Sequence, residues 1–526
     1  MVEEYDILIK NVKIVDGSGT PWFVGDIGIK DGRIEKVGKI QEKGEIEISG
    51  ENLIAAPGFI DIHNHSDVSI LVEPSSKNYI SQGVTTVVVG NCGLSAAPLS
   101  DKTPETLSFL LGPYADKVEV TWKTFEEYLE TLDKTDIAVN VATLVGHNTI
   151  RAAVMGIENR KPTQNELNEM KELVREAMEV GAFGMSTGLI YDPGVFSDTD
   201  EIIELAKVAV EYNGIYASHI RNESDLLVKA TLEAIRVGKE ANTRVEISHH
   251  KASGKRNWRL VKTTLALMEY YRRLGIEVTC DVYPYTFAST DLSAFFPPWT
   301  REHDLPSLVR DPAIRRRLKE ELSRPSLEWE NILFDAGFDG TIVAYSEVFK
   351  EYEGKSLLEI SKELNMNPYD VMFMLIEKDP NLEVIAGGMS EEDVKYVISH
   401  RLSMIGSDGS VMEFGEGHPH PRSYGTFPRV IAKYVKEEKI ITLEEAIKKM
   451  TYLPAWKLGL KDRGLIKEGF KADIVLFDFW NIKDTATFRE PHNYADGMKY
   501  VIVNGKIVVD NGEFTNELPG EVLRRC

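Results

Sequence analysis

The chain has 526 residues, of which 43% are hydrophobic and 27% charged, a balance typical of a globular protein with two or three structural units and no membrane span. Its formal net charge of −22 argues against a nucleic-acid partner, because phosphate contacts need a basic face, and it favours a small-molecule substrate. The N-terminus lacks the basic start and apolar block of a signal peptide, and three cysteines are too few for a disulfide framework, so we expect a cytoplasmic protein.

Both ends of the chain read as parts of one small β domain. DILIKNVKIVDG, DIGIKDGRIEKVG and EIEISGENLIAAPG alternate apolar with polar residues and contain Asp-Gly or Gly turns. Near the other end, KADIVLFDF and KYVIVNGKIVVDNGEF repeat this pattern, with Asn504 and Gly505 as a hairpin turn. We therefore expect residues 1–56 and 461–526 to form a single β-sandwich domain.

The chain between these ends, residues 57–460, alternates strand-like apolar runs with helical stretches such as TQNELNEMKELVREAMEVGA. This alternation is the signature of repeated βα units. Eight such units close as a barrel whose active site lies at the carboxyl ends of the strands. The expected fold class is therefore α/β, a (β/α)8 TIM-type barrel. The candidate strands are 56–63, 84–92, 138–147, 182–191, 214–219, 244–250, 277–285 and 401–408.

A long connection separates the seventh and eighth candidate strands, from about Phe287 to about His400. It is far longer than one helix, and it contains the Pro-rich segment SAFFPPWTREHDLPS. Connections of this length are usually functional. We expect an inserted lid or subdomain at about residues 287–345.

Two histidines end the first barrel strand, His63 and His65 in FIDIHNHSD. Residues two apart on a strand face the same way, so both imidazoles can reach one metal ion. A second pair, His418 and His420, lies in the Pro- and Gly-rich loop GEGHPHPRSYG, where no strand orients it, and short motifs of this kind arise by chance. Position on a strand favours the first pair as ligands.

Three further strands end in metal-binding residue types: Cys92 ends the second, His219 the fifth and His249 the sixth. Taken alone, Cys92 is a small apolar filler and each histidine a hydrogen-bonded structural residue. These separate interpretations do not explain why all three lie at the same rim as His63. Together with a carboxylate, they suit zinc. The neighbouring His250 is expected to face away from the barrel interior.

A carboxylate, Asp408, ends the eighth candidate strand in SMIGSDGS. A buried carboxylate needs a partner, and a metal-bound water supplies one. Asp408 is therefore a candidate ligand, a candidate general base, or both. Zinc makes hydroxide available near neutral pH, and an aspartate can accept the proton at attack and hand it to the leaving amine.

This arrangement resembles the amidohydrolase superfamily, whose members carry His-x-His on strand one, histidines on strands five and six and an aspartate on strand eight. Cyclic-amide members such as hydantoinases bridge two metals with a lysine on strand four, but AFGMSTGLIY contains no lysine. A metal-ligating cysteine on strand two is similar to the D-aminoacylases, as are GLIYDPG, SHIRNE, ISHHK, YPYTFAST and HPRSYGTFPR. The resemblance covers nearly the whole chain.

The resemblance implies a zinc centre with two positions. It assigns Cys92, His219 and His249 to a tightly held zinc ion. A second, weaker position falls to His63, His65, Cys92 and Asp408.

The resemblance also implies substrate contacts near the carboxylate or the oxyanion, namely Lys251, Tyr283, Ser289 and Arg422, with Tyr191 lining the pocket. Arg422 suits a carboxylate because a guanidinium binds two oxygens at once. Two cysteines, Cys280 and Cys526, are expected to be non-catalytic, and His147 at the end of the third strand structural or a partner of a ligand.

The function that follows is zinc-dependent hydrolysis of N-acyl-D-amino acids to a carboxylate and a free D-amino acid. One alternative is a dipeptidase for peptides with a C-terminal D-residue, since an aminoacyl group is also an acyl group. A cyclic amidase of the hydantoinase or dihydroorotase type is disfavoured by the absent lysine, and a non-enzymatic metal-holding scaffold by the presence of Asp408. Neither the side-chain preference nor the oligomeric state follows from the sequence.

A further hypothesis concerns temperature. Glu and Lys are abundant, whereas Gln occurs only at positions 41, 82 and 164, a bias that resembles proteins adapted to heat. A thermophilic protein should show a high melting temperature, and an ordinary melting curve would contradict the hypothesis.

Overall fold

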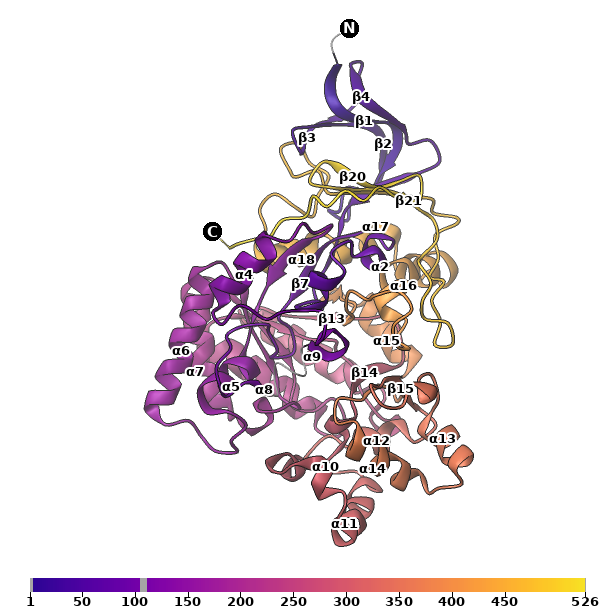
Figure 1. The fold of residues 1–526 in the computed structure, drawn as a ribbon. Helices are drawn as coiled ribbons and strands as arrows, with labels where there is room; N and C mark the ends of the chain where they lie inside the picture. The colour runs from indigo at the N-terminus through magenta and orange to yellow at the C-terminus, as the bar shows by residue number, and fades with distance from the viewer. Residues whose placement is uncertain (1–2, 105–110, 526) are drawn as a thin grey trace.

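The computed structural model describes residues 3–104 and 111–525, and its centre is a barrel of parallel strands (Figure 1). Each of the eight candidate strands contains an observed strand. Two runs of parallel pairing, β6-β7-β8 and β9-β10-β11-β12-β13-β17, follow one another along the chain. A parallel bridge between Asn64 and Gly409 joins the first and last strands, so the barrel is closed. The strands are β6 (Phe59–Asp61), β7 (Val84–Val89), β8 (Asn140–Thr143), β9 (Val145–Gly146), β10 (Gly184–Gly188), β11 (Ile215–His219), β12 (Arg244–Ile247), β13 (Val278–Val282) and β17 (Ser403–Ile405).

Amphipathic helices cover the outside of the barrel. In α6, Met170 and Val174 are buried on one face, and a capping box between Thr163 and Glu166 fixes the first turn. Neighbouring helices α6, α7, α8 and α9 pack in chain order, and Figure 1 shows α6, α7 and α8 along one flank. The helices around the barrel are α1 (Ser69–Val72), α2 (Lys77–Ile80), α4 (Phe125–Asp133), α5 (His147–Met155), α6 (Gln164–Glu179), α7 (Thr199–Glu211), α8 (Leu227–Ala241), α9 (Leu260–Arg273), α15 (Glu391–Ser399), α16 (Arg422–Arg429), α17 (Leu443–Met450) and α18 (Tyr452–Leu458).

The two ends of the chain share one β-sheet, at the top of Figure 1. Strand β5 joins the halves, pairing with β1 in parallel and with β18 antiparallel. Isoleucines from both ends fill a common hydrophobic core, including Ile9, Ile474 and Ile502. The hairpin expected at Asn504 and Gly505 is present, between β19 and β20. The strands are β1 (Glu3–Ile14), β2 (Phe23–Lys30), β3 (Arg33–Gly38), β4 (Lys43–Ser49), β5 (Ile54–Pro57), β18 (Ile474–Phe477), β19 (Met498–Val503), β20 (Lys506–Asp510) and β21 (Glu513–Phe514).

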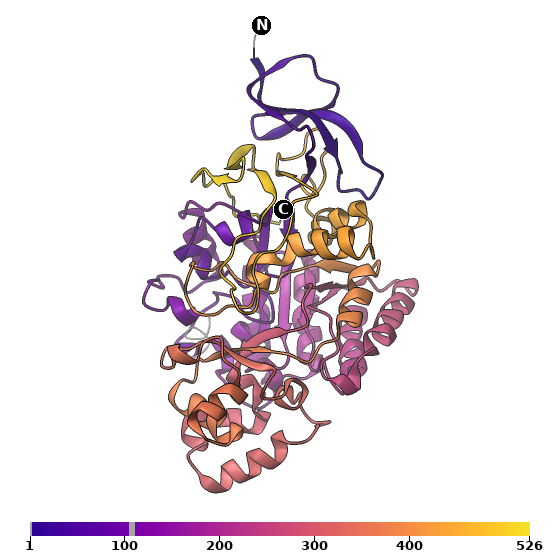
Figure 2. The same ribbon diagram turned by 90° about the vertical axis from the view of Figure 1, so that its right-hand side faces the viewer.

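A compact insertion lies between β13 and β17, at the end of the molecule opposite the β domain (Figure 2). The sequence predicts an end of the insertion at about residue 345, but its small sheet continues to Ala386. A separate hydrophobic cluster fills the insertion from Leu292 to Ala386, including Phe295 and Phe373, and also contains Ile190. The insertion contains β14 (Ala288–Asp291), β15 (Thr341–Tyr345), β16 (Glu383–Ala386), α10 (Leu305–Leu308), α11 (Pro312–Leu322), α12 (Ile332–Ala336), α13 (Leu357–Leu364) and α14 (Pro368–Lys378).

Across the described ranges, no helix combines the length and the apolar character that crossing a bilayer requires. Cys92 and Cys280 are both buried free thiols. Cys526 lies outside the described residues.

Candidate metal centre and substrate cavity

The predicted ligands meet at the carboxyl rim of the barrel. His63 and His65 follow β6, Cys92 follows β7 and Asp408 follows β17. His219 is the last residue of β11, and His249 lies two residues after β12. All except the partly buried His65 are buried. Residues far apart in the sequence therefore share one enclosed space.

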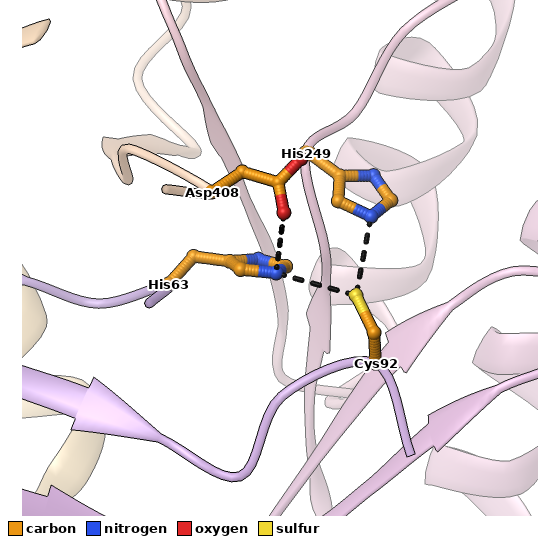
Figure 3. Close-up of side chains that lie close together, drawn as sticks. All are labelled: His63, Cys92, His249 and Asp408. Carbon is orange, nitrogen blue, oxygen red and sulfur yellow. Dashed lines mark hydrogen bonds and ion pairs between the residues drawn. The ribbon is translucent and has the colours of Figure 1, made fainter. Parts of the chain in front are cut away.

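Four of these side chains form one candidate metal-binding group: His63, Cys92, His249 and Asp408 (Figure 3). The sulfur of Cys92 lies 3.3 Å from Nε2 of His63 and 3.4 Å from Nε2 of His249. Oδ1 of Asp408 lies 3.3 Å from Nε2 of His63. One potential ligand atom from each residue lies within 4.8 Å of those of the other three, as the donors around a single ion must.

His65 and His219 extend the cluster on either side. Nε2 of His65 lies 3.0 Å from Oδ1 of Asp408, and Nδ1 of His219 lies 2.9 Å from Nε2 of His249. The other ring nitrogen of His219 is buried without a hydrogen-bond partner, although buried polar atoms are normally satisfied. Converging nitrogen, sulfur and carboxylate donors with an unsatisfied nitrogen among them fit zinc. The residues present therefore suit the metal that the sequence predicts.

Three of the converging residues have left-handed backbones: φ is 51° at Cys92, 35° at His249 and 54° at Asp408. Residues other than glycine rarely adopt this conformation, and it costs about 1–3 kcal/mol where it occurs at functional sites. At these residues the left-handed backbone interrupts the alternating side-chain directions of the strand before each of them. His250 then lies on the other side, with Nε2 2.7 Å from Oγ1 of Thr264 in α9, facing away from the cluster as expected.

The cluster holds opposite charges together in a buried setting. Although burial raises the pKa of the Cys92 thiol, the imidazoles of His63 and His249 hold it well below its ordinary value. Burial likewise raises the pKa of Asp408, but the Arg422 guanidinium and the imidazoles of His249 and His63 hold it well below the usual range. A thiolate and a carboxylate are the forms that ligate a metal.

Two carboxylates that the sequence analysis did not identify support the cluster from behind. Oε1 of Glu223 lies 2.9 Å from Nδ1 of His249, and both of its oxygens accept from Nζ of Lys251. Oδ2 of Asp281 lies 3.3 Å from Nδ1 of His63, and Oδ1 accepts from the backbone N–H of His249 at 2.8 Å. Partners of this kind orient ligating imidazoles and fix their tautomers.

Both missed carboxylates carried a signal in the sequence. On β13, Asp281 shares a face with Thr279, opposite to the core-facing Cys280 and Val282. Glu223 ends the motif SHIRNE, four residues after His219, and a second candidate metal group consists of His219, Glu223 and His249. Burial raises the pKa of Glu223, but Lys251 and His249 lower it overall.

A cavity of about 240 Å³ opens onto the cluster. Of the predicted substrate contacts, its wall includes Tyr191, Lys251, Ser289 and Arg422. Tyr283 is buried behind this wall. Its ring centre lies 5.6 Å from Nζ of Lys251 and 5.0 Å from the guanidinium carbon of Arg422. Tyr283 therefore packs behind the wall, against the cationic groups of Lys251 and Arg422.

The two cavity cations already have partners. Arg422 is the first residue of α16 and is buried, with Nη1 donating to Oδ2 of Asp408 at 2.6 Å. Lys251 donates to both oxygens of Glu223 at 2.7 and 2.8 Å. Arg422, expected to bind a substrate carboxylate, therefore also orients Asp408.

The insertion contributes one side of the cavity. Ser289 lies on β14 and its Oγ donates to the carbonyl of Val384 at 3.3 Å. The hydroxyl of Tyr191 lies 3.1 Å from Oγ1 of Thr290 on the same strand. The barrel and the insertion are thus in direct contact where the substrate would lie.

The remaining histidines considered in the sequence lie outside the cluster. Nε2 of His147 lies 2.8 Å from Oε1 of Glu201 and is fully buried. Nε2 of His418 lies 2.6 Å from the carbonyl oxygen of Phe488, and Nε2 of His420 lies 3.0 Å from that of Phe287. The loop histidines hold chain segments together, as their position in a Pro- and Gly-rich loop suggests.

Comparison with known proteins gives consistent matches along the chain. The model of the amidohydrolase family matches residues 47–272 and 359–509. A D-aminoacylase from Alcaligenes xylosoxydans xylosoxydans is 36% identical over 99% of this chain and 98% of its own. An N-acyl-D-aspartate deacylase from the same organism is 37% identical over 98% and 95%.

Solved structures agree. The N-acyl-D-glutamate deacylase of Bordetella bronchiseptica, complexed with zinc and a phosphonate inhibitor, has a TM-score of 0.85 at 33% identity and covers 99% of this chain and 100% of its own. A D-aminoacylase structure has a TM-score of 0.83 at 35% identity with the same coverage. An L-hydantoinase, at 15% identity and a TM-score of 0.59, shares the fold.

Proposed function

The chain belongs to the D-aminoacylase family of the amidohydrolase superfamily and is a metal-dependent amidohydrolase, and from this premise we propose that it hydrolyses N-acyl-D-amino acids to a carboxylate and a free D-amino acid. The observation that carries the proposal is the buried convergence of His63, Cys92, His249 and Asp408. This donor set opens onto a cavity large enough for a small acylated amino acid.

Zinc is the proposed metal. His219, His249 and Cys92 would hold the tighter ion, and His63, His65, Cys92 and Asp408 a weaker second one. When bound, zinc supplies Lewis acidity toward a scissile carbonyl and lowers the pKa of water toward neutrality. Glu223 and Asp281 then keep His249 and His63 in the tautomers that present Nε2 to the cluster.

Asp408 is the proposed proton carrier. Its Oδ2 is held by Arg422 at 2.6 Å, which leaves Oδ1 directed at His63 and His65. The low pKa of Asp408 keeps the carboxylate ionised at neutral pH. It can therefore accept a proton at Oδ1 during attack and return it to the departing amine.

The substrate carboxylate is proposed to bind among Lys251, Arg422 and Ser289. Tyr283 packs behind both cations and fixes their positions. With the carboxylate and the scissile carbonyl both held, inversion at the α-carbon would drive the side chain into the wall that should accept hydrogen. A preference for the D enantiomer follows from this arrangement.

Hydrolysis of paired D and L N-acetyl amino acids, with and without chelator, tests the proposal. Activity on the D forms should be lost on chelation and restored by zinc. Equal rates on D and L substrates, or full activity in the metal-free protein, would contradict it. Hydantoin should not be hydrolysed, because β10 (Gly184–Gly188) carries no lysine.

A further inference from the structure

Two carboxylates in the substrate cavity, Asp291 and Glu383, have no hydrogen bond or ion pair from their side chains to another residue within the described ranges. Asp291 is the last residue of β14 and Glu383 the first of β16, and they are register partners on antiparallel strands. Asp291 is only 8% exposed. Like charges opposite each other destabilise a sheet, and a buried unpaired carboxylate costs free energy.

Most other charged groups of the described cavity wall are already engaged, although Oδ1 of the buried Asp67 also has no hydrogen-bond partner. Within that described part of the wall, the only lysine and arginine are Lys251, held by Glu223, and Arg422, held by Asp408. Glu330 accepts the backbone N–H of Glu223 at 2.5 Å, and Glu416 is paired with Lys350 at 3.0 Å. The described wall therefore has more carboxyl groups than cations, and Asp291 and Glu383 lie together on its insertion side.

These two carboxylates lie within reach of a substrate. Ser289 precedes Asp291 by two residues on β14, so the two side chains leave the same face of the strand about 7 Å apart. Tyr345, opposite Glu383 in the sheet, adds an aromatic ring to the cavity wall, and aromatic faces attract cations. A substrate held near Ser289 and carrying a positive group a few bonds away would meet this region.

We propose that Asp291 and Glu383 select substrates that carry a cationic group, an ammonium or a guanidinium, on the insertion side of the cavity. This proposal rests on the proposed deacylase function and refines its substrate class. The cation has two possible sources: the side chain of a basic D-amino acid, or the free amino group of an aminoacyl substituent, as in a dipeptide. An acidic side chain would be repelled, unlike the substrates after which the aspartate and glutamate deacylases are named.

Burial favours the protonated form of both carboxyl groups. Burial raises the pKa of Glu383 to about 7, with Arg422 opposing the rise. Burial, together with the neighbouring Glu383 charge, raises the pKa of Asp291 well above its usual value. A bound cation would stabilise the ionised pair.

Two matched substrate pairs distinguish the sources of the cation. N-acetyl-D-lysine against N-acetyl-D-norleucine tests the side chain, and glycyl-D-leucine against N-acetyl-D-leucine tests the acyl group. In at least one pair the zinc-loaded enzyme should favour the cationic member by about tenfold or more in kcat/KM, since hydrogen bonds to charged groups contribute at this level. Neutral members that equal or exceed the cationic ones in both pairs would overturn the inference.

Binding of the same four compounds, measured by calorimetry, gives a readout that does not need turnover. If none is hydrolysed, the deacylase function is wrong, and the inference is then decided by whether the cationic members bind more tightly. Tighter binding in at least one pair supports it, and equal or weaker binding in both overturns it.

Two variants locate the selectivity. In Asp291→Asn and Glu383→Gln the preference for the cationic member should fall toward one, whereas Asp339→Asn, which changes an exposed carboxylate of the same insertion outside the cavity wall, should retain it. Thermal melting checks the fold, and neither cavity variant should melt below the wild type, because each replaces a carboxyl group that has no partner on another residue with an amide of nearly the same shape. A preference that persists unchanged in both variants would contradict the proposal.

Discussion

The carboxylate of Asp408 contacts three side chains, those of Arg422, His63 and His65. Oδ2 accepts from Arg422, and Oδ1 lies near both His63 and His65. The residue therefore links the metal cluster to the substrate cavity. Its two functions, holding a metal and moving a proton, can be separated by substitution.

Asp408→Asn should lower kcat by roughly 10²–10⁴-fold, because an amide cannot accept a proton at neutral pH. Zinc held by Cys92, His219 and His249 should remain. The measurement pairs zinc content with kcat. A variant that keeps its zinc and more than about a tenth of wild-type kcat would show that the shuttle lies elsewhere, and loss of zinc would show that Asp408 is chiefly a ligand.

The same substitution leaves the buried Arg422 without its anionic partner, which is costly for a buried pair. Asp408→Asn should therefore melt at a lower temperature than the wild type. In the double variant Asp408→Asn/Arg422→Gln part of this loss should return, because both charges are gone. Melting curves of both variants test this coupling, and strictly additive losses would contradict it.

Cys92 and Cys280 form a matched pair of buried thiols. Cys92→Ala should lose both zinc and activity, because its sulfur lies 3.3 Å from His63 and 3.4 Å from His249. Cys280→Ala should keep both, because Cys280 packs in the hydrophobic core with its sulfur 3.9 Å from the Leu402 carbonyl oxygen. Zinc per chain and specific activity are the measurements. A zinc-replete, active Cys92→Ala protein would rule out cysteine ligation.

At the scale of elements, the insertion forms hydrogen bonds with the loop that follows β11. Glu330 accepts the backbone N–H of Glu223, and Asp335 accepts the Ser224 hydroxyl at 2.7 Å and pairs with Arg256. Since Glu223 in turn contacts His249 and Lys251, the insertion is connected to the metal cluster by a short chain of contacts.

Removing the hydrogen bond between Glu330 and the Glu223 backbone should reduce activity without removing any candidate metal ligand. Glu330→Ala should lower kcat/KM by about tenfold, because it removes the acceptor that fixes the Glu223 backbone. Glu328→Ala is the matched control, since Glu328 is exposed and only two residues away. Zinc content should stay at the wild-type level in both. Equal kinetics in the two variants would show that the insertion does not position Glu223.

At the scale of the whole molecule, the segments that carry the candidate ligands join the first and last strands of the barrel. The backbone N–H of Asp408 donates to the carbonyl of His63, and that of His65 to the carbonyl of Gly409. These contacts connect the first strand to the last, over 340 residues later. A metal bound here would add further links between the same segments.

Removal of the metal should therefore destabilise the fold as well as stop catalysis. A ligand present at a thousand times its Kd stabilises the native state by about 4 kcal/mol, so chelation should lower Tm by roughly 5 °C or more. Zinc should restore Tm, whereas magnesium, which prefers oxygen ligands, should not. An unchanged Tm in a protein whose metal loss has been verified would contradict a structural contribution of the centre.

The sequence by itself determined the barrel strands, the union of the two chain ends and the residue types at the rim, because alternation and turn residues are local properties of the chain. The tertiary structure decided how the rim is arranged. Left-handed backbones at Cys92, His249 and Asp408 are set by the loops that follow the strands and by contacts with distant segments. Strand alternation alone does not predict them.

The supporting residues and the insertion were also decided by tertiary packing. Glu223 and Asp281 carry a signal in the sequence, but their role as partners of His249 and His63 follows only from the positions of their oxygens in the folded molecule. The end of the insertion at Ala386 is defined by β16 pairing with both β14 and β15, and long-range pairing of this kind leaves no local pattern in the sequence. For the same reason the opposition of Asp291 and Glu383, separated by more than ninety residues, appears only in the folded molecule.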